Sequence, residues 1–390
     1  MIHKRGAMAR CALSVLFALI LAFFPLAQRQ LRALAVLARL TGVQLPAAGE
    51  TYLLEPVETA ATRLRGTAGE ARAHHYVARG ARTGDRPALL LLHGAHPRGI
   101  DEPRLVALAN ALAAAGLDVV TPELAALREM QLDASVSAEL RALAAEHARR
   151  ARVHAVGVIG ISFAGGLALL AAAEQQADAP IGFVVGVGAH HDLSRVCEFY
   201  AGRDVRGPEG QPVDVAAHPY GARVMLKDQL PQLVAAEDLA GARLALDAYL
   251  HDQKREARKL AARLSPQGQR VLQVLLDERA SPELGAYLAR AVEVKGAQLM
   301  AASPRGRLAG LRVPVLLIHG TGDPVVPSIE TRYLAREVPR PWLRAQLITS
   351  LLRHAEFPGR PSVASTWPVL SFLRKLFEAA GSASTPRYGP

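Results

Sequence analysis

Cysteine is scarce in this chain of 390 residues. Its two cysteines, Cys11 and Cys197, lie far apart and are not expected to pair, so a disulfide framework is excluded. The adjacent His190 and His191, followed by Asp192, point to opposite sides of an extended segment. No second His/Cys cluster in the sequence completes a metal site with them. We therefore expect no metal and no cofactor.

Lysine and aromatic residues are also few. Only six of the 46 basic residues are lysine, and aromatic residues make up 5% of the chain. The formal net charge of +11 would suit a nucleic-acid partner. The arginines, however, are scattered through an Ala/Leu-rich chain, and no basic run is interleaved with aromatics. We expect no nucleic-acid partner, whereas a mild attraction to anionic membrane surfaces fits the charge.

The N-terminal segment lacks charge over a long apolar stretch. Lys4 and Arg5 precede this stretch, which runs from Cys11 to Ala27. A basic start followed by an apolar stretch is typical of a secretory signal. Because Pro25 stands where cleavage requires a small residue, we favour an uncleaved signal anchor; a cleaved signal and a buried helix of the domain are the alternatives. The prediction is a membrane-anchored or exported protein, with an amphipathic helix over residues 31–40.

The most informative motif is a serine in a tight turn between a strand and a helix. Ser162 lies in the run Gly-Ile-Ser-Phe-Ala-Gly (160–165), after the apolar residues 153–159 and before the helical pattern of residues 167–173. Small neighbours allow a sharp turn, from which the serine projects near a helix N-terminus, where negative charge is stabilised. The alternative is a serine that merely caps the helix.

Two further apolar runs end in polar residues. Residues 88–92 lead into His93-Gly94-Ala95-His96, and residues 313–318 lead into a turn that contains Asp323. Downstream, His354 follows the apolar stretch 342–352. Apolar strands that alternate with helical patterns favour a parallel α/β sheet.

Together these landmarks resemble the α/β-hydrolase superfamily, in which nucleophile, acid and base follow one another in the order Ser162, Asp323, His354. The resemblance covers roughly residues 50–190 and 310–380. It implies a mostly parallel sheet flanked by helices, in which His354 takes the proton of Ser162 and Asp323 orients and stabilises the imidazole.

The resemblance also implies an oxyanion hole built from the backbone N–H groups of Ala95 and Phe163. One departure concerns the family pattern Gly-x-Ser-x-Gly, because its last position is Ala164 and the glycine is delayed to Gly165. A single added methyl group leaves the turn intact, so the departure does not change the interpretation.

Other residues are candidates for the same roles or for a place beside them. Asp192, after the apolar run 181–187, is a rival for the catalytic acid, since some α/β-hydrolases carry the acid after that strand. His93 is interpreted as structural, closing the end of its strand. His96 either lines the pocket or faces solvent.

Five segments are expected along the chain. Candidate early strands cover residues 51–57 and 74–78, so the catalytic core is expected to need nothing before residue 47. The insertion is mainly helical, and Ser265-Pro266 and Ser281-Pro282 have the form of helix starts. It is interpreted as a lid over the nucleophile, the alternative being a helical domain that packs aside. The segments are a targeting segment with connector (1–48), a first core part (49–189), the insertion (190–310), a second core part (311–380) and a disordered tail (381–390).

The expected function is that of a serine hydrolase, similar to carboxylesterases and lipases, which cleaves an ester or related acyl bond through an acyl-enzyme. Peptidases, thioesterases and acyltransferases use the same triad, and the fold alone does not choose among them. The alternative from another class is a noncatalytic binding or scaffold member of the fold, with the insertion as its partner surface.

Overall fold

A computed structural model describes residues 26–44, 53–131, 133–176, 179–277, 279, 281–352 and 363–383. Within them eight strands form one sheet, in the order β1-β2-β4-β3-β5-β6-β7-β8. The strands β1 and β2 form an antiparallel hairpin, β2 also pairs antiparallel with β4, and the remaining pairs are parallel. The strands are β1 (Val57–Gly66), β2 (Gly69–Ala78), β3 (Ala88–Leu92), β4 (Asp118–Pro122), β5 (Val156–Ile161), β6 (Ile181–Val187), β7 (Val315–Gly320) and β8 (Leu343–Thr349).

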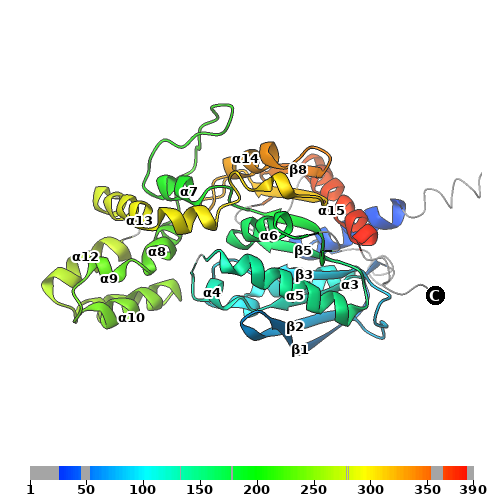
Figure 1. The fold of residues 1–390 in the computed structure, drawn as a ribbon, viewed down its shortest axis with the longest axis horizontal. Coiled ribbons are helices and arrows are strands. Elements are labelled where there is room, and N and C mark those ends of the chain that lie inside the picture. The colour runs from blue at the N-terminus through cyan, green and yellow to red at the C-terminus, as the bar shows by residue number, and fades with distance from the viewer. Residues whose placement is uncertain are drawn as a thin grey trace, which may run out of the picture.

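Helices cover both faces of the sheet (Figure 1). Side chains alternate along each strand, so Leu90 and Leu92 of β3 pack on one face while Leu89 and Leu91 pack on the other. Because parallel strands are buried on both faces, they read as continuous apolar runs, which is why the sequence revealed them. The first face carries α5 (Ser135–Ala151), α6 (Phe163–Ala173) and α14 (Ile329–Glu337), and the second carries α3 (Pro103–Ala114) and α15 (Val363–Ala383).

The sequence-based element boundaries are confirmed in the parallel part of the sheet and only in part at its start. Strands predicted over 88–92, 181–187 and 343–349 are found there. The strand predicted over 74–78 lies within β2, whereas the one predicted over 51–57 meets β1 only at Val57. The two strands form a hairpin closed by a turn at residues 67–68. Most side chains of β1 are exposed or half-buried, so this edge strand lacks the apolar run that identified the others. At the other end, α15 continues to Ala383, past the expected start of the tail, and residues 384–390 lie outside the described part.

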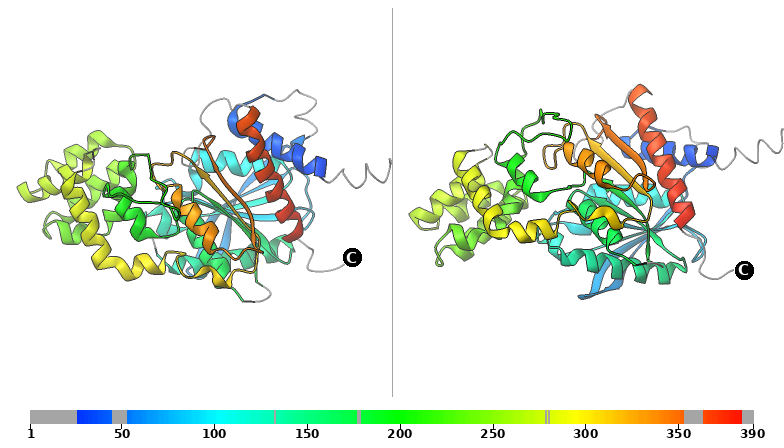
Figure 2. Two further views of the ribbon diagram at one scale, coloured as in Figure 1. Left: turned by 90° about the horizontal axis from the view of Figure 1, so that it is seen from above. Right: turned by 45° about the horizontal axis from the view of Figure 1, so that its top comes forward.

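Residues 26–41 form a helix that packs on the α3/α15 face. Its buried side chains Ala33, Ala35, Val36, Leu37 and Ala38 are at most 5% exposed. The helix lies beside α15 in both views of Figure 2. The sequence interpretation placed this segment in a connector, because an amphipathic helix suits a membrane surface and a protein surface equally well. Residues 1–25, with nearly all of the proposed signal anchor, lie outside the described residues.

No helix in the described ranges is long and apolar enough to cross a membrane.

The insertion is helical, as predicted, and most of it forms a body beside the sheet (Figure 1). Both predicted helix starts are confirmed: the side chains of Ser265 and Ser281 accept hydrogen bonds from the amides of Gly268 and Leu284. The helices of this region are α7 (Leu193–Tyr200), α8 (Pro219–Lys227), α9 (Leu230–Leu233), α10 (Leu239–Leu250), α11 (Lys254–Ala261), α12 (Pro266–Leu276) and α13 (Pro282–Ala301).

The two ends of the insertion are tied to each other. The His190 ring donates from Nε2 to the carbonyl of Ala302 at 2.9 Å, and the Asp192 carboxylate pairs with Arg305 at 2.8 Å. Burial lowers the pKa of His190, which keeps this ring neutral. We call residues 190–193 and 302–305 the neck.

The neck is also fixed to the core. Glu330 of α14, which is fully buried, accepts the backbone amides of His191 and Asp192 at 2.8 Å each. On α6, a Cβ added to Gly166 would lie 2.3 Å from Cε1 of His190. The insertion therefore leaves and re-enters the core at a rigid point beside α6.

Candidate active site

Ser162 stands between the end of β5 and the first residue of α6, as the motif predicted. Its backbone has φ 56° and ψ −126°, a region that non-glycine residues rarely occupy and that costs about 1–3 kcal/mol. Its amide donates to the carbonyl of Val187 at 2.7 Å, which holds the strained turn against the end of β6. The Ser162 hydroxyl makes no capping hydrogen bond to α6, so the interpretation as a helix cap is not supported.

Glycines beside Ser162 explain how the turn is so tight. A Cβ on Gly160 would lie 2.5 Å from the carbonyl oxygen of Ala164, and a Cβ on Gly165 would lie 2.7 Å from Cβ of Ala189. Contacts under 3.0 Å leave no room for any side chain at these two positions. The close approach that requires glycine is thus made by Gly165, and Ala164 is accommodated as a fully buried residue. The departure from the family pattern has a structural reason.

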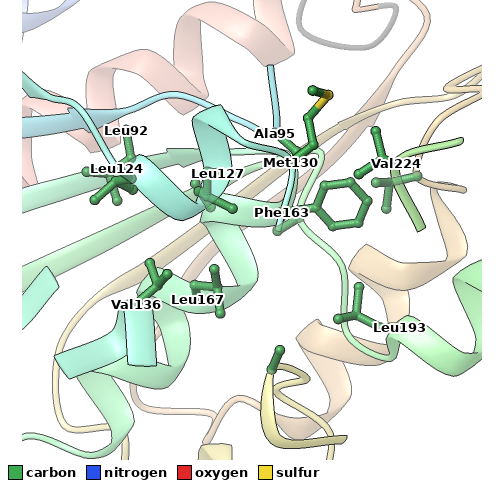
Figure 3. Packing of buried hydrophobic residues seen from close by; sticks show 14 of the residues in the cluster. Leu92, Ala95, Leu124, Leu127, Met130, Val136, Phe163, Leu167, Leu193 and Val224 are labelled. Carbon is green, nitrogen blue, oxygen red and sulfur yellow. The ribbon is translucent and has the colours of Figure 1, made fainter. Parts of the chain in front are cut away.

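Both candidate oxyanion donors belong to segments next to the serine. Phe163 is the first residue of α6, where backbone N–H groups have no partner within the helix. Its ring points away from the sheet toward Val224 and Met130 (Figure 3). Ala95 follows Gly94, whose position is packed so closely on the turn that an added Cβ would lie 3.2 Å from Cβ of Ser162.

His93 has the structural role that the sequence suggested. Its Nδ1 donates to the carbonyl of Gly94, and its Nε2 accepts the amide of Leu124 at 3.0 Å. Burial lowers the pKa of His93, so the ring remains neutral and holds the loop after β3.

Asp323 follows β7 at the same edge of the sheet and is 1% exposed. Its Oδ1 accepts the amides of Val325 and Val326 at 2.8 and 3.0 Å, which fixes the carboxylate in one orientation. The other oxygen, Oδ2, would lie 3.3 Å from a Cβ on Gly188, the residue after β6. Because the carbonyl of Val187 accepts the amide of Ser162, only the end of β6 separates the serine turn from this carboxylate.

The rival acid Asp192 is engaged elsewhere. It belongs to the neck, where Oδ1 caps α7 by accepting the amide of Ser194 and Oδ2 pairs with Arg305. These contacts use both oxygens to hold the insertion, which favours Asp323 as the catalytic acid.

The sheet is mostly parallel with an antiparallel start, and a strained serine stands between β5 and α6. These two features together identify the architecture. This chain has the α/β-hydrolase fold. The resemblance noted from the sequence is thereby confirmed as one of fold.

No family model and no curated protein matches the chain. Among solved structures, the 2-hydroxy-6-oxo-6-phenylhexa-2,4-dienoate hydrolase of Rhodococcus sp. strain RHA1 is similar, with 16% identity, a TM-score of 0.44, and 83% of this chain and 99% of that one covered. An α/β-hydrolase fold protein of Nakamurella multipartita has 17% identity and a TM-score of 0.39, with 83% and 100% covered. A serine hydrolase of Cycloclasticus zankles has 12% identity and a TM-score of 0.43, with 84% and 97% covered. These likenesses are distant, and the fold assignment rests on the strand order and the serine turn.

Ser162 opens onto a cavity of about 830 Å³ in this α/β-hydrolase fold. The walls are mainly aliphatic and come from the α3/α15 side of the sheet. His96 is among the polar residues at the cavity, so it lines the pocket, as one of the two sequence interpretations held. Burial lowers the pKa of His96 to about 4, which keeps it uncharged at neutral pH.

His354, the predicted base, lies outside the described residues. The chain immediately before it is placed: Leu352 lines the same cavity as Ser162.

Two residues at this cavity were missed by sequence reasoning. Tyr220, in the first turn of α8, donates from its hydroxyl to the carbonyl of Ala95 at 3.0 Å. Burial raises the pKa of the Tyr220 phenol, which therefore stays protonated and able to donate. Leu40, on the N-terminal helix, also lines the cavity. Neither residue belongs to a motif, so only the folded chain brings them to the site.

No group of three or more His, Cys, Asp or Glu side chains is arranged to hold a metal ion in the part of the chain that the structure describes.

Proposed function

We propose that the protein is a serine hydrolase that cleaves an ester or a related acyl bond through an acyl-enzyme. The observation that carries this proposal is Ser162, held in a strained turn with its hydroxyl not used for capping and placed at a largely apolar cavity. Natural proteins keep backbone strain of this kind where it serves a function.

In the proposed mechanism, Ser162 Oγ attacks the acyl carbon while His354 takes its proton. Asp323 holds the imidazole in the correct tautomer and stabilises the imidazolium. The amides of Ala95 and Phe163 stabilise the oxyanion. The bond to the leaving alcohol then breaks, and the alcohol takes the proton from His354. A water molecule repeats the sequence on the acyl-enzyme, releasing the carboxylic acid and restoring Ser162.

The apolar walls support an acyl group with substantial hydrocarbon over a peptide or a strongly charged substrate. Pockets that bind small molecules usually have volumes of about 300–1,000 Å³ with few polar groups, and this cavity fits that range. Of the insertion, His218 and Tyr220 line the cavity, which supports a limited covering role for the start of α8.

The proposed location is outside the cytoplasm, at a membrane, held by the N-terminal segment. Support comes from the basic start and the uncharged stretch Cys11–Ala27. Full-length protein is expected to stay with membranes after a high-salt wash, because salt weakens only the attraction of the basic surface to anionic lipid.

A fluorophosphonate probe tests the enzymatic proposal directly. It should label the full-length protein at Ser162 and leave a Ser162→Ala variant unlabelled. The variant should fold normally and lose hydrolysis by a factor on the order of 10⁶, because covalent chemistry needs the hydroxyl. Well-folded wild-type protein that resists the probe and cleaves no acyl ester would favour the noncatalytic alternative.

Two matched carboxamide variants test the choice of acid. Asp323→Asn should lower kcat by a factor on the order of 10⁴, since the amide favours the wrong imidazole tautomer. Asp192→Asn should leave kcat nearly unchanged and lower the melting temperature, because it breaks the pair with Arg305. If Asp192→Asn lowered kcat strongly and Asp323→Asn did not, Asp192, which follows β6, would be the catalytic acid.

A further inference from the structure

The cavity extends from Ser162 along one face of the sheet. It is lined by Ile161 and Val187 at the strand ends, and two residues farther back by Ile159 and Val185. Two residues of a strand cover about 7 Å, so the space reaches under the catalytic edge.

Two helices form the sides of this space. From α3 come side chains at helical spacing, Leu105, Leu108 and Leu112, and seven residues of helix span about 10 Å. From α15 come side chains with the same spacing, namely Val369, Phe372, Leu373 and Leu376. The result is an elongated space with aliphatic walls and the serine at its polar mouth.

Leu40 adds a wall from a separate element. It is half-buried, packs against the cluster that includes α3 and α15, and lines the cavity, while the rest of its helix is held by Ala33, Val36 and Leu37. Figure 2 shows the N-terminal helix lying against α15. The position of this wall is thus set by buried packing and is independent of the insertion.

We infer that this space binds the hydrocarbon chain of a fatty acyl ester, and that Leu40 is a specificity-determining residue that limits the size of that chain. The inference rests on the proposed function for the reaction at Ser162. The proposed substrate class is an ester of a medium- or long-chain fatty acid. An elongated aliphatic wall stabilises each buried methylene and offers a short acyl group, such as acetyl, few contacts.

The test compares p-nitrophenyl acetate, octanoate and palmitate as substrates of the full chain. The wild type should prefer octanoate or palmitate over acetate in kcat/KM. Leu40→Trp, which adds bulk to the wall, should lower kcat/KM for palmitate by about ten-fold or more and change that for acetate by less than about two-fold. Leu40→Ala should shift the preference toward the longer or bulkier chain.

The matched control is Leu34→Ala on the same helix, since Leu34 is 37% exposed and does not line the cavity. It should leave the chain-length preference unchanged. The inference is overturned if the ratio of palmitate to acetate is the same in the wild type, Leu40→Trp and Leu40→Ala.

A binding measurement separates this inference from the proposed reaction. Ser162→Ala protein should bind palmitate in calorimetry, and adding Leu40→Trp should weaken that binding about ten-fold. Binding without hydrolysis of any ester in the wild type would refute the reaction and leave the chain site standing. Hydrolysis without palmitate binding would refute the chain site and leave the reaction standing.

Discussion

The two faces of the sheet differ in how completely they are filled. On the α5/α6 face, side chains such as Val158 and Val184 are fully buried against the helices. On the α3/α15 face, Ile161 and Val187 are only half-buried, because they line the cavity. The same two strands, β5 and β6, supply both pairs, and the residues on each strand are three positions apart. We call the α5/α6 face the filled face and the α3/α15 face the hollow face. The hollow face is open only toward the strand ends, since its inner residues Ile159 and Val185 are 2% and 1% exposed.

The largest expected effect comes from removing the helix that covers the hollow face. A variant lacking residues 1–46 loses the buried Val36 and Leu37 with their alanine neighbours. Each buried aliphatic side chain contributes about 1.5–3 kcal/mol, so the loss should be about 5 kcal/mol, a large part of ordinary domain stability. Denaturant unfolding measures it, and a variant lacking residues 1–24 is the control. Equal midpoints would show that the helix contributes nothing.

A matched pair of core substitutions tests the filled and hollow faces directly. Leu140→Ala on α5, at a fully buried position, should cost about 3 kcal/mol of unfolding free energy. Leu373→Ala on α15 should cost roughly half as much, since its side chain borders space that already exists. Leu373→Ala should also change chain-length preference, whereas Leu140→Ala should not. Similar costs and similar kinetics for both would abolish the distinction.

At the mouth of the hollow face, Tyr220→Phe removes the hydrogen bond that holds the carbonyl of Ala95. We expect kcat to fall roughly ten-fold with a smaller change in KM, because one buried hydrogen bond of about 1–1.5 kcal/mol positions the oxyanion loop. Tyr333→Phe is the control, since the Tyr333 hydroxyl donates a hydrogen bond to the carbonyl of Arg206, outside the cavity. An equal effect of both variants would mean that Tyr220 has no special positioning role.

The smallest effect concerns pH. Burial lowers the pKa of His96 to about 4, while in the unfolded chain His96 takes up a proton below about pH 6.5. Its contribution to stability is therefore full above about pH 6.5 and is lost as the pH falls toward about 4. His96→Gln should flatten the decline of the melting temperature over this range, and the exposed His154→Gln should not. A steeper decline in His96→Gln would reverse the sign of this argument.

The sequence predicted what depends on local pattern. The parallel strands, the serine turn and the helix starts at Ser265 and Ser281 follow from apolar runs, small residues and caps, and each is found in the structure. Leu40 and Tyr220 were missed, because their roles arise from contacts between elements far apart in the chain. The N-terminal helix was assigned to a connector for a related reason: amphipathic spacing does not reveal which apolar surface it meets.

The neck has a consequence for how this chain could diverge among relatives. Because its two ends bind each other and Glu330, the chain between them can change in length or be exchanged without moving the catalytic edge. Gly166 then serves as a marker of that arrangement, since His190 leaves no room for a side chain there. In a lineage that had lost the insertion and its neck, position 166 would be released from this constraint and free to accept alanine. Sequences that retain both should keep the glycine.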